Sequence, residues 1–113
     1  MSKIGYIRVS SIDQNTDRQE VALKELKVDK IFTEKLSGKN TNRPELNKML
    51  DYVREGDTLY IESISRLARS IKDLLSLVQI LQEKGVDLVS LKENIDTTTP
   101  QGRFILTIFG ALS

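Results

Sequence analysis

Short runs of β-branched and aliphatic residues alternate along this chain with segments of helical periodicity, and this alternation limits the fold more than any other feature. The first β-rich run covers residues 3–9, and three more follow at residues 30–33, 58–61 and 86–91. Strands that alternate with helices in this way predict an α/β fold. We expect a mainly parallel sheet of four to five strands, flanked by helices.

The first two helical segments carry recognisable start and stop signals. Thr16 and Gln19 have the spacing of a capping box ahead of an apolar stripe. Asn42 is expected to cap the second helix, with Pro44 in its first turn and Gly56 just beyond its end. The polar stretch at residues 34–41, between these two helices, is expected to be an exposed loop.

A third helix is expected over residues 71–84. Ser70 and Asp73 have the spacing of a helix cap, and Gly85 follows the last turn. The apolar spacing places Ile71 among the residues expected to face the core. Residues 93–99, after the fourth β-rich run, are expected to form a polar connection.

A last helix is expected from Thr99-Pro100 onward, and it is apolar around most of its circumference. One stripe facing the core does not account for so many apolar residues. The helix is either buried entirely within the domain, or it leaves the domain and packs against a partner chain. We favour the second interpretation, with a helix that continues past Ser113. The chain then divides into a domain at residues 1–99 and the start of a truncated helix at residues 100–113.

Composition excludes several classes of function. The 113 residues include 17 Lys and Arg against 16 Asp and Glu, a net charge of +1. We therefore expect the chain itself to bind nucleic acid weakly and through local contacts. The absence of cysteine and histidine removes thiolate nucleophiles, Ser-His-Asp triads and the usual zinc sites. We expect no ATP or magnesium cofactor, because neither a phosphate-loop motif nor a suitable acidic grouping is present. No apolar run is long enough to span a bilayer, which predicts a cytoplasmic protein without a membrane partner.

The end of the first β-rich run carries a candidate reacting group. Arg8 and Ser10 point the same way if the strand continues to Ser10, because side chains repeat every second residue. Arg66 and Arg69 follow the third run, and the carboxyl ends of parallel strands open on one edge of a sheet. Three guanidiniums around one hydroxyl require an anion between them, and a phosphodiester fits. The plainer alternative is a turn serine with solvated arginines.

The segment Tyr6-Ile7-Arg8-Val9-Ser10, followed by Asp13-Gln14 and Asp17-Arg18-Gln19, resembles the active-site signature of the serine recombinases, the resolvase and invertase family. Asn42-Arg43-Pro44 and Ser65-Arg66-Leu67-Ala68-Arg69-Ser70 match the family in order. The resemblance covers essentially the whole chain. It implies the catalytic domain of a site-specific DNA recombinase that cleaves and rejoins DNA through a 5′-phosphoserine intermediate, with no metal or other cofactor.

The resemblance also implies a role for each matching residue. Ser10 is implied to be the nucleophile, and Arg8, Arg66 and Arg69 are implied to bind the scissile phosphate and stabilise its transition state. Phosphate-binding or supporting roles are implied for Arg43, Gln14, Gln19 and Ser65. The implied partners are DNA and a second copy of the chain, in a homodimer that assembles to a synaptic tetramer through a long oligomerisation helix. No small-molecule substrate is implied.

One position departs from the family pattern. Ser65 stands where many members have Asp, and a hydroxyl is a poor base at neutral pH, so the acid–base role is left unassigned. A degenerate recombinase retained for DNA architecture is therefore one alternative. A non-catalytic, receiver-like α/β regulatory module is another, but it needs an acidic pocket where this chain has Arg8 and Ser10.

Overall fold

A computed structural model of the chain describes residues 1–10, 17–36 and 43–112. Within these residues, one sheet has the strand order β2-β1-β3-β4-β5. The strands are β1 (Lys3–Ser10), β2 (Lys30–Leu36), β3 (Thr58–Ile61), β4 (Asp87–Ser90) and β5 (Ile95–Asp96). Strands β1 to β4 pair in parallel, and β5 pairs with β4 in the antiparallel sense. The predicted α/β fold with a mainly parallel sheet is confirmed.

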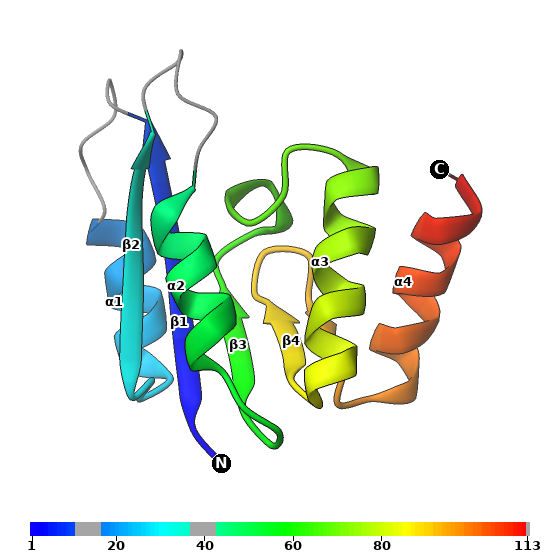
Figure 1. Cartoon of the computed structure of the whole chain (residues 1–113), viewed down its shortest axis with the longest axis horizontal. Coiled ribbons are helices and arrows are strands. Elements are labelled where there is room, and N and C mark those ends of the chain that lie inside the picture. Colours follow the sequence, from blue (N-terminus) through cyan, green and yellow to red (C-terminus); the bar gives the residue numbers. More distant parts are fainter. Residues whose placement is uncertain (11–16, 37–42, 113) are drawn as a thin grey trace.

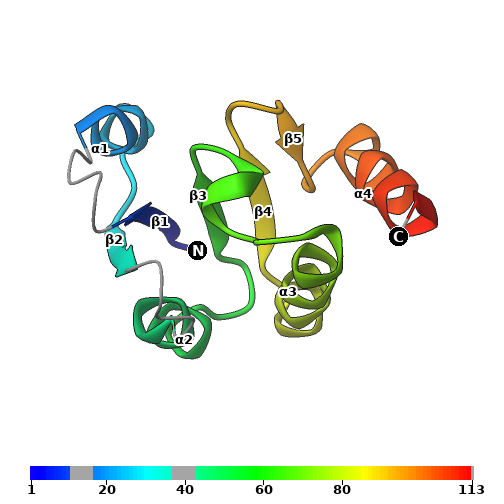
Figure 2. The ribbon, with the colours of Figure 1, turned by 90° about the horizontal axis from the view of Figure 1, so that it is seen from above.

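The helices form a layer on each side of this sheet. They are α1 (Asp17–Glu25), α2 (Pro44–Tyr52), α3 (Ile71–Lys84) and α4 (Pro100–Leu112), with a short 3₁₀ turn, η1 (Ile64–Arg66), between β3 and α3. Figure 1 shows α2 and α3 in front of the strands, and the view from above in Figure 2 shows α1 on the opposite face.

The core is divided by the sheet into two apolar clusters. The smaller cluster contains Ile7, Val9 and Leu23, under α1. The larger cluster lies under α2 and α3 and includes Ile4, Tyr6, Leu46, Met49, Leu59, Ile61, Leu74, Leu81 and Leu88. Because side chains alternate along a strand, Tyr6 and Ile7 face opposite layers. Arg8 follows Tyr6 by two residues and therefore faces the layer of α2 and α3.

The prediction of an exposed loop at residues 34–41 was partly wrong, because β2 continues through Glu34 to Leu36. Glu34 is only 2% exposed, and its carboxylate accepts a hydrogen bond from the backbone N–H of Glu45 at 3.0 Å. This carboxylate satisfies an N–H group at the start of α2, where a negative charge is favourable. The predicted cap, Asn42, lies outside the described residues, and Arg43 occupies the N-cap position.

Helix α3 has the predicted bounds. The Ser70 hydroxyl accepts a hydrogen bond from the backbone N–H of Asp73 at 3.1 Å, and Gly85 ends the helix with a left-handed φ of 75°. The prediction that Ile71 faces the core was wrong, because its side chain is 42% exposed. As the first residue of the helix, Ile71 lies at the rim of the core and lines an open groove.

Strand β5 was not predicted. It falls within residues 93–99, which we expected to form only a polar connection, and it places Ile95 opposite Ser90 of β4. Ile95 is 2% exposed and belongs to the larger core cluster. Two residues are too few to show a strand periodicity, so the pattern gave no signal.

Helix α4 packs one side against the domain, next to β5 and α3 (Figures 1 and 2). Gly102 lies so close to β5 that an added β-carbon would be 1.9 Å from the carbonyl oxygen of Asp96. Leu106 is buried, whereas Phe104 is 64% and Ile108 is 43% exposed. The helix is therefore not tucked fully into the domain. None of the helices in the described part of the chain has both the length and the apolar character needed to cross a membrane.

Candidate active site

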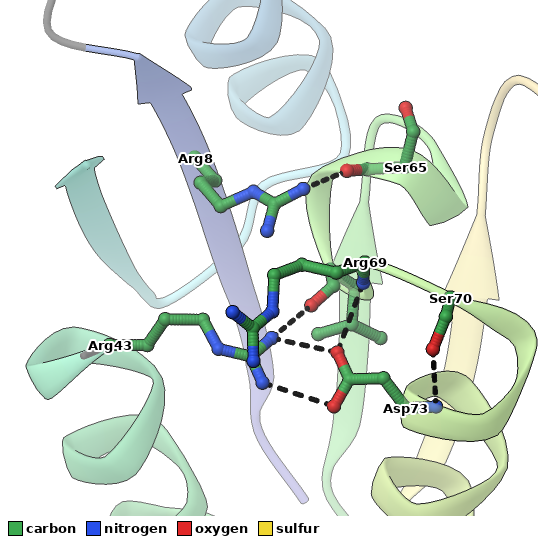
Figure 3. A network of polar contacts seen from close by, with 7 residues as sticks. Arg8, Arg43, Ser65, Arg69, Ser70 and Asp73 are labelled. Atoms are coloured by element: carbon green, nitrogen blue, oxygen red, sulfur yellow. Dashed lines mark hydrogen bonds and ion pairs between the residues drawn. The ribbon is translucent and has the colours of Figure 1, made fainter. Parts of the chain in front are cut away.

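The carboxyl end of β1 lies beside the turn that follows β3, because these two strands are parallel neighbours. The Arg8 guanidinium donates a hydrogen bond to the main-chain carbonyl oxygen of Ser65 in η1 (Figure 3). In return, Nη1 of Arg66 donates to the main-chain carbonyl oxygen of Arg8 at 3.3 Å. These reciprocal contacts hold two predicted site arginines at one end of the sheet.

Positive charge accumulates around Arg8. Burial lowers the pKa of Arg8, and the nearby positive charges of Arg43, Arg66 and Arg69 lower it further, while Tyr6 acts in the opposite direction. An arginine keeps its charge at neutral pH, so Arg8 is repelled by the three other guanidiniums. An anion among them would relieve that repulsion, and a phosphate offers oxygens in the geometry that guanidiniums bind best.

Arg43 lies at the N-cap of α2 and reaches across to α3. Its two terminal nitrogens each donate to one carboxylate oxygen of Asp73 at 3.0 Å, and Nη1 also donates to the carbonyl oxygen of Leu67 at 3.1 Å (Figure 3). Burial alone would raise the pKa of Asp73. The hydrogen bonds from Arg43 and from the backbone N–H of Arg69 hold that pKa below its usual range instead.

Arg66 and Arg69 do not share one helical face, because η1 ends at Arg66. The buried Leu67 lies between them, and Arg69 precedes the cap of α3. The Arg66 side chain has Nε 3.8 Å from a carboxylate oxygen of Glu62 and is 29% exposed. The Arg69 backbone N–H donates to Asp73 at 3.0 Å, and its side chain is exposed. Arg66 therefore reaches the Arg8 region from the 3₁₀ turn η1, and Arg69 reaches it from the irregular residues between η1 and α3.

The structure describes only some of the remaining predicted site residues. Gln19, at the start of α1, is 2% exposed and donates from Nε2 to the carbonyl oxygen of Arg8 at 3.4 Å. Its predicted capping partner, Thr16, lies outside the described residues. Ser10 is the last residue of β1, opposite Leu36 in β2. The Ser10 side chain and the whole of Gln14 lie outside the described residues.

Two further polar residues, Glu34 and Tyr6, lie beneath the arginines and were not predicted as site residues. Burial and the charge of Glu34 raise the pKa of Tyr6, while Arg8 and Arg43 act to lower it. The Tyr6 hydroxyl and Oε1 of Glu34 are buried, without a hydrogen-bond partner among the described residues. The two-residue spacing from the apolar Phe32 to Glu34 was the available signal, since it places both on one face of a strand.

Comparisons with known proteins show which family the chain belongs to. The family model described as "Resolvase, N terminal domain" matches residues 3–113. The chain is 47% identical over its full length to the DNA-invertase hin of Salmonella typhimurium, of which it covers 60%. It is 48% identical over 97% of its length to the serine recombinase gin of Escherichia phage Mu, of which it covers 57%.

The fold is also similar to that of a solved structure, the N-terminal catalytic domain of TP901-1 integrase. The TM-score is 0.82 at 28% identity, over 97% of this chain and 92% of that one. The chain spans only 57 to 60% of the two relatives named above. A receiver-like module is not favoured by these matches. The chain belongs to the resolvase family of serine recombinases, in which it corresponds to the N-terminal domain.

Proposed function

We propose that this chain is the catalytic domain of a site-specific DNA recombinase, which cleaves and rejoins DNA through a phosphoserine link at Ser10. The observation that supports this most is the cluster of arginines around Arg8, at the end of the strand that Ser10 completes. Hydrogen bonds join Arg8 to the turn that carries Arg66, and the charges of Arg43, Arg66 and Arg69 act on Arg8. A positive cluster next to a serine suits attack on a phosphodiester. The names of the relatives, DNA-invertase and serine recombinase, agree with this function.

The proposed reaction is a displacement at phosphorus. The Ser10 hydroxyl loses its proton, and its oxygen forms a bond to the phosphorus as the bond to the 3′-oxygen of the deoxyribose breaks. The released 3′-oxygen takes up a proton, and the 5′ end stays attached to Ser10. Arg8, Arg66 and Arg69 stabilise the negative charge that develops on the other phosphate oxygens. Rejoining is the same displacement in reverse, with a 3′-hydroxyl from the exchanged strand.

Strand exchange needs more than one copy of the chain. We propose that residues 1–99 are the catalytic domain and residues 100–113 the start of an oligomerisation helix, which forms a homodimer that assembles to a tetramer on DNA in the cytoplasm. The exposed Phe104 and Ile108 support this, because the side of α4 away from the domain offers apolar surface. Arg43, Ser65, Gln14 and Gln19 are proposed to bind phosphate or support the catalytic residues.

The decisive comparison is between Ser10→Ala and Ser11→Ala in the recombinase that contains this chain. Each protein is incubated with a supercoiled plasmid carrying its recombination site, and covalent protein–DNA adducts are counted after denaturation. We expect adducts with the wild type and with Ser11→Ala, and none with Ser10→Ala, although the latter still binds the site. Adducts that persist in Ser10→Ala would refute the proposed function.

A further inference from the structure

Asp73 places a carboxylate inside the arginine cluster. Its two oxygens accept hydrogen bonds from both terminal nitrogens of Arg43, each at 3.0 Å. One of these oxygens also accepts from the backbone N–H of Arg69 at 3.0 Å (Figure 3). A bidentate guanidinium fork together with a backbone N–H is the arrangement in which proteins hold a phosphate oxygen pair. The carboxylate therefore makes the contacts that a phosphate would make with Arg43.

The position of Asp73 favours its negative charge. It lies in the first turn of α3, where the helix dipole stabilises an anion, and its own N–H is capped by the Ser70 hydroxyl. The side chains of Arg43 and Asp73 are only 12% and 21% exposed, so water and salt screen the pair less than a surface ion pair. The pair occupies both terminal nitrogens of Arg43.

Arg8 differs from Arg43 in this respect. Its guanidinium donates to the carbonyl oxygen of Ser65, which carries no formal charge. Among the described residues Arg8 has no ion pair, whereas the charge of Arg43 is compensated by the Asp73 carboxylate. The four arginines of the cluster thus offer unequal attraction to a phosphate.

We propose that Asp73 is an internal counter-anion that competes with the scissile phosphate for Arg43. The inference rests on the proposed function and extends it to a residue outside the implied catalytic set. Asp73 acts through Arg43 and is therefore a positioning residue. In the DNA-free protein it holds Arg43 against α3, and Arg43 binds phosphate only when this carboxylate gives up the fork. The carboxylate then keeps its contacts with the Arg69 N–H and the start of α3.

The test is a titration of this chain with inorganic phosphate, followed through the Nε–Hε resonances of its arginines by NMR. Asp73→Asn keeps the shape and the acceptor for the Arg69 N–H, and it removes the charge. The matched control is Asp51→Asn, which removes one negative charge from an exposed position on α2. We expect Asp73→Asn to bind phosphate about five- to tenfold more tightly than the wild type, with the shift at Arg43. Asp51→Asn should change the affinity by less than about twofold.

A double variant shows whether the gain passes through Arg43. Arg43→Ala combined with Asp73→Asn should lose the gain and bind no more tightly than the wild type. The proposal would be overturned if Asp73→Asn bound phosphate no more tightly than Asp51→Asn, or bound no detectable phosphate. The titration does not involve Ser10. A gain in affinity without Ser10–DNA adducts would therefore refute the recombinase function alone, and adducts without the gain would refute the counter-anion alone.

Discussion

Arg8 in the first strand and Ser65 in η1, 57 positions later, are joined by a hydrogen bond from the guanidinium to a main-chain carbonyl oxygen. Because the acceptor belongs to the main chain, the contact does not depend on the side chain at position 65. A serine in place of the family's aspartate is therefore compatible with the position of Arg8. The Ser65 hydroxyl lies 2.9 Å from the hydroxyl of Ser63, which is buried.

This geometry indicates that Ser65 supports the site through its main-chain carbonyl oxygen, so we expect Ser65→Ala to keep most of the cleavage activity. We expect a change in cleavage rate of less than about threefold, together with a loss of about 1 kcal/mol in unfolding free energy, since the buried Ser63 hydroxyl loses its partner. Single-turnover cleavage and urea denaturation measure the two effects. A loss of about a hundredfold in rate would show that the Ser65 hydroxyl takes part in the chemistry.

The arginine cluster predicts that Arg8→Ala reduces cleavage severely. Removing a group that stabilises transition-state charge typically costs about 3–4 kcal/mol, and we expect the same for Arg66→Ala and Arg69→Ala. Arg8→Lys should recover only part of the rate, because an ammonium lacks the planar fork. The matched control is Arg54→Ala, at an exposed position near the amino terminus and away from this cluster. Equal losses in Arg54→Ala and Arg8→Ala would mean that general positive charge, and not the cluster, supports cleavage.

The Arg43–Asp73 pair predicts an acid-sensitive part of the stability. The pKa of Asp73 is lower in the folded chain than its ordinary value of about 3.9, so the folded state favours the ionised form. This stabilisation is fully present above the ordinary pKa and is lost as the pH falls through the lower, folded pKa. Urea denaturation should show a difference between wild type and Asp73→Asn at pH 7 that shrinks on acidification. If the difference in unfolding free energy stayed constant down to the pH at which the protein unfolds, the Arg43–Asp73 pair would not be the source of the acid sensitivity.

The contact between α4 and β5 predicts that Gly102→Ala is strongly destabilising. The added β-carbon would lie 1.9 Å from the Asp96 carbonyl oxygen, which belongs to the backbone and cannot turn aside. We expect a loss of at least about 1–3 kcal/mol in unfolding free energy, because the helix has to shift from the sheet. Gly5→Ala is the comparison, since its β-carbon meets the flexible end of the Leu23 side chain at 2.8 Å. A smaller loss in Gly102→Ala than in Gly5→Ala would show that α4 is held loosely.

Periodicity and capping signals were enough to predict the parallel strands and α3, because these depend on neighbours in sequence. Ser70 and Gly85 carry that information locally. The periodicity and capping signals did not predict that Glu34 continues a strand. The burial of Glu34 depends on α2, because its carboxylate accepts a hydrogen bond in the first turn of that helix. Strand β5 was also missed, since two residues show no periodicity.

The site was predictable to a smaller extent. The strand order explains why Arg8 and η1 lie together, and parallel strands implied this arrangement. The pairing of Arg43 with Asp73 spans 30 positions and depends on how α2 packs beside α3. The spacing of Ser70 and Asp73 predicted the helix cap, which involves the backbone N–H of Asp73. It did not predict that the Asp73 carboxylate pairs with Arg43. Contacts of that kind are set by tertiary packing.

The bond between protein and DNA shows whether Ser10 attacks a phosphate held by the arginine cluster. Cleavage complexes formed by the wild-type recombinase are digested with protease and nuclease, and the adduct is located by mass spectrometry. We expect one adduct, in which the Ser10 oxygen carries the 5′ phosphate of the cleaved strand and the other DNA end is a free 3′-hydroxyl. Attachment to any other residue, or through a 3′ phosphate, would contradict it.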